Sequence, residues 1–300
     1  MIDYQAIMGV KKLSALSEDG SGARIAVLDS GIPTLCVNGA QSSACSSYVE
    51  DKFGHATAVA SILAGGRGII GLCGRAEMLY MPVLDSSGRG SVKSVADGIY
   101  RAIDAGVDLI NLSLGFLRTE ECPTALKMAC DTDFRAKKTI ICAAGNDGGL
   151  VNWPAALRTT ICVGSTGRNG LRMPFSSIGE VDFVAPGLDL SVLDVNGSLR
   201  VVSGTSFSTA LVTGVAALLV SKMKARGRES PMPAVRNELR AFARDVYSPG
   251  WDEGTGFGLI SGKIDDPTVD MKIRAGFFDR MLSKIKSLFG ISKGATDGRF

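Results

Sequence analysis

Short apolar segments alternate with helical patterns along most of this chain, and the alternation limits the folds that it can adopt. The apolar segments are four to seven residues long, which is the length of a buried strand. They cover residues 24–28, 78–84, 109–114, 139–144, 160–163 and 181–185. Between several of them lie apolar residues at helical spacing, in residues 55–63, 92–103, 125–137 and 206–226. Strands that alternate with helices predict a three-layer α/β/α domain, in which helices cover both faces of a mainly parallel sheet.

Two polar residues stand where such a sheet places its chemistry. Working residues gather beyond the carboxyl ends of parallel strands. Asp29 directly follows the first apolar segment, and Asn146 comes just after the fourth. We therefore expect both side chains at the edge of the sheet where a reaction centre would form.

The composition is that of a globular protein and excludes several other classes. Of the 300 residues, 45% are hydrophobic and 21% are charged, which excludes a disordered chain, a collagen-like repeat and a coiled coil. The net charge of +3 is too small to attract nucleic acid. The uncharged run at residues 201–221 is long enough to cross a bilayer, but it holds seven Ser or Thr residues. A buried central helix is the better interpretation of that run.

Cysteine usage and the first residues favour an intracellular protein. The seven cysteines do not cluster as a disulfide framework does, and Cys142 and Cys162 lie in apolar segments that suit buried, reduced thiols. Cys36 and Cys45 flank a polar loop and could pair in an oxidising compartment. The N-terminal residues contain no secretory apolar stretch. Together these features predict a cytoplasmic location.

The last residues form a separate segment. The alternation ends after Gly262, which divides the chain into a domain at residues 1–262 and a basic tail at residues 263–300. Apolar residues at helical spacing predict an amphipathic helix at residues 271–294, where six Lys or Arg residues stand against one acid. Such a helix could pack on the domain, dock a protein partner or cover the cleft, or lie peripherally on an anionic membrane surface. The sequence leaves these alternatives open.

The chain contains one histidine, so acid–base chemistry that needs an imidazole is restricted to one position. A serine hydroxyl needs a base to remove its proton, a carboxylate to orient that base, and donors that stabilise the developing oxyanion. Asp29, His55, Asn146 and Ser206 supply these parts, each in a setting marked by glycine. We interpret them as the parts of an enzyme with a hydroxyl nucleophile.

The residues around these four resemble the motifs of the subtilisin-like serine proteases, the subtilases. Asp29 begins Asp-Ser-Gly and matches the family's D-x-G motif, and His55 begins His-Ala-Thr-Ala-Val-Ala and matches its H-G-T-x-V-A motif. Ser206 stands in Gly-Thr-Ser-Phe-Ser and matches the G-T-S-x-(A/S) motif, and Asn146 matches the side-chain oxyanion donor. The four occur in the family's order, and the resemblance covers roughly residues 5–262, with a closing segment at residues 256–260.

This resemblance implies a subtilisin-like fold and a serine endopeptidase. Asp29 would orient His55, His55 would deprotonate Ser206, and Asn146 with the Ser206 backbone N–H would stabilise the tetrahedral intermediate. The alternatives are a peptide ligase or macrocyclase of the same fold, and a catalytically silent pseudoprotease that only binds peptides. The sequence departs from the family pattern at three positions, Ala56, Ala210 and Leu211. None of these departures removes a catalytic atom.

The expected partner is a peptide or protein substrate, which the family binds as an added strand with side-chain pockets for selectivity. By resemblance, two segments flank that strand: Gly88, Arg89 and Gly90, and Ser113, Leu114 and Gly115. A second group would line the first specificity pocket: Ala143, Ala144, Gly145 and Asn152, walled by Trp153 and by Pro154, which the family has in cis. Arg89 at the rim predicts a preference for acidic substrate residues, and equal cleavage of acidic and neutral peptides would contradict it.

No metal or cofactor is expected. No His or Cys pairs stand at metal-ligand spacing. Many extracellular subtilases hold calcium in a loop after the histidine helix, but residues 64–70 contain glycines and a cation here and lack carboxylates. Secreted relatives also carry a long propeptide. With 28 residues before Asp29, we expect this chain to fold without one or with help from another chain.

Overall fold

The computed structural model describes residues 1–10, 19–33, 49–247 and 249–260. The chain divides into two units, Met1–Ile264 and Asp265–Phe300, and all described residues belong to the first. The predicted tail helix at residues 271–294, the domain boundary after Gly262 and the pair of Cys36 and Cys45 lie outside the described residues. Those three stay predictions.

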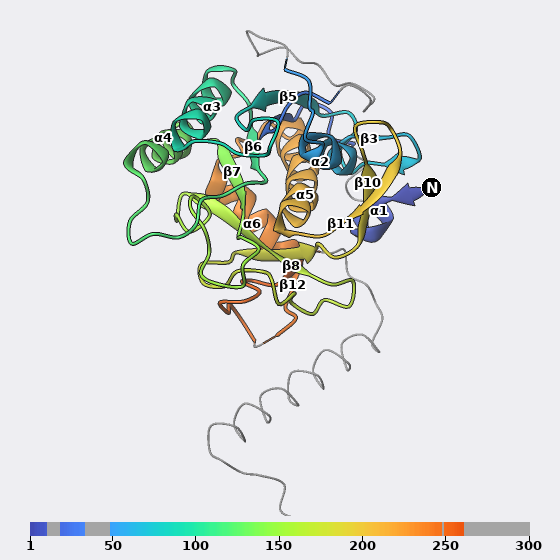
Figure 1. The fold of residues 1–300 in the computed structure, drawn as a ribbon. Coiled ribbons are helices and arrows are strands. Elements are labelled where there is room, and N and C mark those ends of the chain that lie inside the picture. Colours follow the sequence, from blue (N-terminus) through green and yellow to red (C-terminus); the bar gives the residue numbers. More distant parts are fainter. Residues whose placement is uncertain (11–18, 34–48, 248, 261–300) are drawn as a thin grey trace, which may run out of the picture. The chain divides into compact units, whose positions relative to one another are not determined.

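An eight-stranded sheet runs through the described domain (Figure 1). Its strand order is β12-β13-β9-β8-β7-β6-β2-β5. In chain order the strands are β2 (Arg24–Asp29), β5 (Glu77–Pro82), β6 (Leu109–Leu112), β7 (Thr139–Ala143), β8 (Thr160–Thr166), β9 (Phe183–Pro186), β12 (Ala243–Arg244) and β13 (Leu259–Ile260). All neighbouring strands are parallel except β12 and β13. The mainly parallel sheet predicted from the sequence is therefore confirmed.

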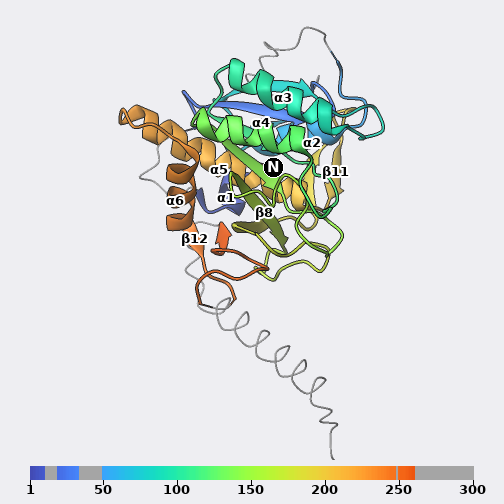
Figure 2. The ribbon, with the colours of Figure 1, turned by 90° about the vertical axis from the view of Figure 1, so that its left-hand side faces the viewer.

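Helices cover both faces of this sheet. Figure 2 shows α3 (Val92–Asp104) and α4 (Thr124–Arg135) side by side on one face. On the other face α5 (Thr205–Ala225) lies across β6, β7, β8 and β9, and α2 (His55–Leu63) and α6 (Met232–Phe242) pack against it. These layers form the three-layer α/β/α fold that the sequence predicts.

Several short elements did not follow from the sequence pattern. They are α1 (Tyr4–Ile7), the small sheet of β1 (Ile2–Asp3), β3 (Gly65–Gly66) and β4 (Ile69–Ile70), the hairpin of β10 (Leu190–Leu193) and β11 (Leu199–Val202), and helix α6. The strands among them have only two to four residues, too few to show a period. Strand pairing holds them, either within a hairpin, as for β10 and β11, or with a distant segment, as in the parallel register of β1 on β4.

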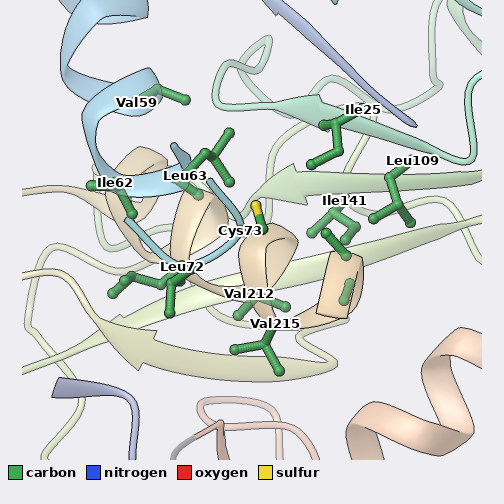
Figure 3. Close-up of a cluster of buried hydrophobic side chains, with 14 of the residues drawn as sticks. Ile25, Val59, Ile62, Leu63, Leu72, Cys73, Leu109, Ile141, Val212 and Val215 are labelled. Carbon is green, nitrogen blue, oxygen red and sulfur yellow. The ribbon is translucent and has the colours of Figure 1, made fainter. Parts of the chain in front are cut away.

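The main core lies between the sheet and the α2–α5 pair. Figure 3 shows part of it, with Val59, Ile62 and Leu63 from α2, Val212 and Val215 from α5, and Ile25, Leu109 and Ile141 from the sheet. Seventeen of the 21 residues of α5 are buried, and Gly214 lets Leu72 pack closely, because a Cβ there would lie 2.7 Å from the Leu72 side chain. Among the described helices α5 alone is long and apolar enough to span a membrane, yet 94% of its apolar window is buried inside the protein. The predicted buried central helix is confirmed.

Two cysteines lie side by side in the middle of the sheet. Cys142 of β7 and Cys162 of β8 are register partners, and both are buried free thiols, as the sequence predicts. Burial raises the pKa of each thiol well above its ordinary value. Both therefore remain protonated and fill space in the core.

Candidate active site

Four side chains from four elements meet at the carboxyl end of the sheet. Asp29 is the last residue of β2, His55 is the first residue of α2, and Ser206 is the second residue of α5. Asn146 lies three residues beyond the end of β7. The expectation that Asp29 and Asn146 stand where strands end is confirmed, and His55, Asn146 and Ser206 line one hollow.

Asp29 and His55 form a close pair. His55 Nδ1 lies 2.8 Å from Asp29 Oδ1 and 3.0 Å from Oδ2, and the carboxylate is only 1% exposed. The Ser30 backbone N–H donates to the same carboxylate at 2.7 Å. Burial lowers the pKa of His55, but the charge of Asp29 and the hydrogen bond to it outweigh burial, so the pKa is raised overall. The Nδ1–H donation fixes the tautomer that leaves Nε2 free to accept a proton.

Asp51 is a second buried carboxylate behind the histidine, and the sequence analysis missed it. It is 3% exposed and sits before the N-terminus of α2. Its Oδ1 accepts from Ser30 Oγ and from the Gly54 N–H, both at 2.8 Å, and its Oδ2 accepts from the Thr57 N–H and Oγ1 at 2.7 and 2.6 Å. Negative charge is favoured at this end of a helix. An acid just before a predicted helix was the signal that could have found it.

We expect Asp51→Asn to reduce kcat/KM by about tenfold and to lower the free energy of unfolding by about 1–3 kcal/mol. An amide has two donors of its own, so it cannot accept all four bonds, and the first turn that carries His55 loosens. The Asp51 charge also raises the pKa of His55. In the variant we therefore expect the loss of activity that follows protonation of His55 to occur at lower pH than in the wild type.

Asp19→Asn is the matched control for this variant. Asp19 also accepts from a backbone N–H and a hydroxyl, both of Ser21, but at an exposed turn. Kinetics and thermal unfolding should be measured for both variants. An unchanged pH profile in Asp51→Asn, with a lower melting temperature, would reduce Asp51 to a purely structural residue.

Ser206 and Ser113 bind each other reciprocally. Ser206 Oγ donates to the Ser113 carbonyl at 2.9 Å, and Ser113 Oγ donates to the Ser206 carbonyl at 2.8 Å. Among the described residues no hydrogen bond joins Ser206 Oγ to His55. A rotation about the Cα–Cβ bond redirects the hydroxyl, and catalytic hydrogen bonds often tighten only when substrate binds.

A buried chain of side chains extends this contact into the core. Thr213 Oγ1 donates to Asn111 Oδ1 at 3.0 Å, and Asn111 Nδ2 donates to Ser113 Oγ at 2.9 Å. Asn111 is fully buried in β6. The chain links the middle of α5 to its first turn and holds the nucleophile's backbone against β6. Sequence reasoning did not find this role, although an amide inside a buried strand was a signal.

Asn146 is oriented by Thr205, the residue before the nucleophile. The Thr205 N–H and Oγ1 both donate to Asn146 Oδ1, at 2.8 and 3.0 Å. Since the amide oxygen is occupied, Nδ2 is the group that can donate to a ligand in the hollow. Gly204 has φ +151°, a backbone conformation that side chains rarely adopt, and it turns the chain into α5 next to Asn146. This geometry suits an oxyanion donor.

The residues predicted to bind substrate fall into two places. Ser113, Leu114 and Gly115 follow β6 and lie beside the end of β7, because a Cβ at Gly115 would be 3.9 Å from the Ala143 carbonyl oxygen and 3.3 Å from Asn152 Cβ. Asn152 in turn donates its N–H to the Ala144 carbonyl at 2.8 Å, which brings it to Ala143, Ala144 and Gly145. Gly88, Arg89 and Gly90 form an exposed turn after β5, next to the Phe53 ring. The Trp153–Pro154 bond is cis, as the resemblance implies.

Metal ligands do not gather in the described part of the chain. Within these residues no three His, Cys, Asp or Glu side chains come together. Residues 65–70, in the region where relatives hold calcium, form the hairpin of β3 and β4. The absence of a metal from the reaction stays a prediction.

Comparison with known proteins agrees with this geometry. A family model described as the subtilase family, peptidase S8, matches residues 20–258. The chain is 38% identical over 213 residues to the thermostable alkaline protease of Halalkalibacterium halodurans, covering 68% of this chain and 58% of that one. It is 31% identical over 249 residues to subtilisin DY of Bacillus licheniformis, covering 78% of this chain and 88% of that one. Most of the curated relatives it matches are longer, and it spans between 38% and 64% of their length.

Solved structures show the same relationship. The structure of the prenylagaramide maturation protease PagA superposes with a TM-score of 0.75 at 30% identity, covering 88% of this chain and 98% of that one. A cold-adapted subtilisin-like serine proteinase gives a TM-score of 0.68 at 26% identity, covering 83% and 92%. The family match covers every strand and helix from β2 to β12 and all four site residues. The chain therefore belongs to the subtilase family of serine proteases.

Proposed function

We propose that this chain is a serine endopeptidase that cleaves peptide bonds through an acyl-enzyme on Ser206. The observation that carries the proposal is the meeting of the Asp29–His55 pair, Ser206 and Asn146 around one hollow of about 370 Å³. The relatives described above are proteases, which supports the same reaction class.

Each of the four residues takes one task in the proposed mechanism. His55 Nε2 accepts the proton of Ser206 Oγ as that oxygen attacks the substrate carbonyl, and it then gives the proton to the leaving amine. Asp29 holds the imidazole in orientation and stabilises the imidazolium that forms. Asn146 Nδ2 and the Ser206 backbone N–H donate to the oxyanion. In the second half of the reaction a water molecule takes the place of the amine. His55 accepts a proton from the water as the water attacks the acyl-enzyme, and gives that proton to Ser206 Oγ as the acyl group leaves.

No observation on the described residues favours either alternative to hydrolysis. A ligase or macrocyclase would pass the acyl group to an amine, and a pseudoprotease would bind peptides without chemistry. An intracellular location, and a partner or membrane surface for residues 271–294, are likewise proposals that rest on the sequence alone.

The test is fluorophosphonate labelling of the full chain, together with incubation with a mixed peptide library. Labelling at Ser206 and new peptide termini with water incorporated would support an endopeptidase. Labelling with joined peptides as the main products would indicate a ligase. A folded chain that takes up no label would contradict the proposal in favour of a pseudoprotease.

We expect kcat/KM for an uncharged peptide to rise with pH through an ionisation above 6.5, the ordinary pKa of histidine. The neutral imidazole is the active form, and the pKa of His55 is raised, so protonation removes activity at a higher pH than for free histidine. Initial rates at low substrate concentration from pH 5 to 9 measure this. An apparent pKa well below 6.5 in this profile would contradict the expectation that the Asp29 charge outweighs burial in setting the pKa of His55.

A further inference from the structure

The hollow beside the catalytic residues extends away from the predicted substrate strand. Its lining is Phe53, His55, Asn146, Arg200, Val202, Ser203, Gly204, Ser206 and Phe207. None of the residues predicted to flank the substrate strand or to line its first specificity pocket, at 88–90, 113–115, 143–145 and 152, lines this hollow. Because His55 delivers its proton to the leaving amine, the space that continues past His55 receives the leaving half of the substrate.

One permanent charge lines this hollow, on Arg200 of β11. The alternation of β11 leaves Leu199 and Val201 exposed on one face and places Arg200 and Val202 on the cleft side. Arg200 Nη2 donates to the Gly54 carbonyl at 2.8 Å, directly before His55. This bond anchors the guanidinium beside the catalytic histidine.

The guanidinium retains donors that nothing in the described chain uses. Its Nε is buried and forms an ion pair with Asp194 Oδ1 at 3.6 Å, too long for a hydrogen bond, so the donors open to a ligand are those of the two Nη atoms. Nη1 has no hydrogen-bond partner among the described residues. The bond to the Gly54 carbonyl holds the side chain in place, and its 36% exposure leaves it reachable by a ligand. A planar cation of this kind suits a carboxylate, which can accept two parallel N–H bonds.

We propose that Arg200 makes this subtilase selective for a carboxylate on the leaving side of the scissile bond. The inference rests on the proposed function, because it assigns specificity to the same site. Two sources supply the chemistry: an Asp or Glu side chain in the first two positions after the cut, or the terminal carboxylate of a short leaving segment. Phe53, Val202 and Phe207 give the space an apolar wall around the charge.

The experiment compares three pairs of quenched peptides with the same residues before the cut. The first pair has Glu or Gln in the first position after the cut, and the second pair has Glu or Gln in the second position. The peptides of the third pair end at the second position after the cut, one as a free acid and one as an amide. We expect about tenfold higher kcat/KM for the carboxylate member of at least one pair, and the pair that responds identifies the source. High salt should reduce the ratio, because the guanidinium is partly exposed.

Variants separate Arg200 from the net charge of the protein. Arg200→Gln should bring the ratio close to one, and Arg200→Lys should keep part of it. Arg226→Gln, which removes an exposed charge at the far end of α5, should keep all of it. The labelling rate and the melting temperature of each variant show that it is folded.

Failure of the inference differs from failure of the proposed function. Ratios near one in all three pairs, with efficient cleavage by the wild type, would overturn the role of Arg200. A ratio that survives in Arg200→Gln would overturn it as well. Absence of both cleavage and labelling in the folded wild type would overturn the proposed function, and the inference with it.

Discussion

Replacing Ser206 with alanine should reduce kcat for peptide hydrolysis by about 10⁶-fold while leaving the fold intact. This magnitude was measured on a member of the same family and does not come from the present structure. The change removes Oγ, the atom that attacks the carbonyl, and with it one hydrogen bond to the Ser113 carbonyl. The reciprocal bond from Ser113 Oγ to the Ser206 carbonyl does not need the serine side chain, so the first turn of α5 stays in place.

A double variant makes the test sharper than the single one. If His55 acts only through Ser206, then Ser206→Ala and the pair Ser206→Ala with His55→Ala should have nearly equal residual rates. Asn146→Ala should still reduce that residual rate, since the oxyanion donor acts on any attacking water. Ser198→Ala, at the exposed turn of the β10–β11 hairpin, is the control for removal of one hydroxyl. Full additivity of Ser206→Ala and His55→Ala would contradict a working triad.

The second large effect concerns Asp133, a carboxylate on α4 with no catalytic role. Its side chain is fully buried, and neither oxygen has a hydrogen-bond partner among the described residues. Burial raises the pKa of Asp133 to about 7, against a smaller lowering by the charge of Lys138. The neutral acid is therefore the form that the core accepts.

The sign of the pH effect follows from this raised pKa. Below about pH 3 both the folded and the unfolded chain hold the proton, and the group does not affect stability. As the pH rises from about 3 to 7 the unfolded chain ionises first, so stability falls, and above about 7 the loss stays constant. A shift from 3.8 to about 7 corresponds to a loss on the order of 4 kcal/mol.

Asp133→Asn should remove this dependence. We expect the variant to match the wild type near pH 3 and to exceed its free energy of unfolding by about 4 kcal/mol at pH 8, in urea unfolding at a series of pH values. The difference between the two proteins cancels the other titrating groups. Glu77→Gln should behave in the opposite way, because the hydrogen bond from Arg24 lowers the pKa of Glu77 and stabilises the fold only when the acid is ionised. A difference between Asp133→Asn and the wild type that does not vary with pH would contradict the account.

Local patterns were sufficient for the fold class and for the four central residues of the site. Six strands are visible in the sequence as apolar segments of the right length, and four helices as apolar residues at helical spacing. The motif residues stand at the ends of these segments, beside glycines. The alternation could not give the exact bounds. The third apolar segment continues to residue 114, but β6 ends at Leu112, because Ser113 turns both of its oxygens toward α5.

Three supporting contacts of the site could not be predicted from local patterns, since each joins residues far apart in the chain. Thr205 orients Asn146 across 59 positions, and Thr213 meets Asn111 across 102. Arg200 binds Gly54 across 146 positions. Arg200 lies in a hairpin whose strands have four residues each, too few to be predicted from a hydrophobic period. Such contacts are set by the register of the sheet and the placement of loops.

The position of Ser206 on α5 determines which parts of the molecule can adapt to a substrate. With 17 of its 21 residues buried, α5 exposes its amide groups to solvent only when the whole domain unfolds. We therefore expect the backbone that carries the reacting serine to open only at high free energy, while the Ser206 hydroxyl can still rotate about its Cα–Cβ bond. In the β10–β11 hairpin, β10 has three residues buried in the core, whereas β11 exposes Leu199 and Val201. Segments with few buried contacts open at lower free energy, so we expect β11 to open more readily than α5. We therefore expect substitutions at the exposed positions of β11 to affect the stability of the folded state less than substitutions in β10 or α5.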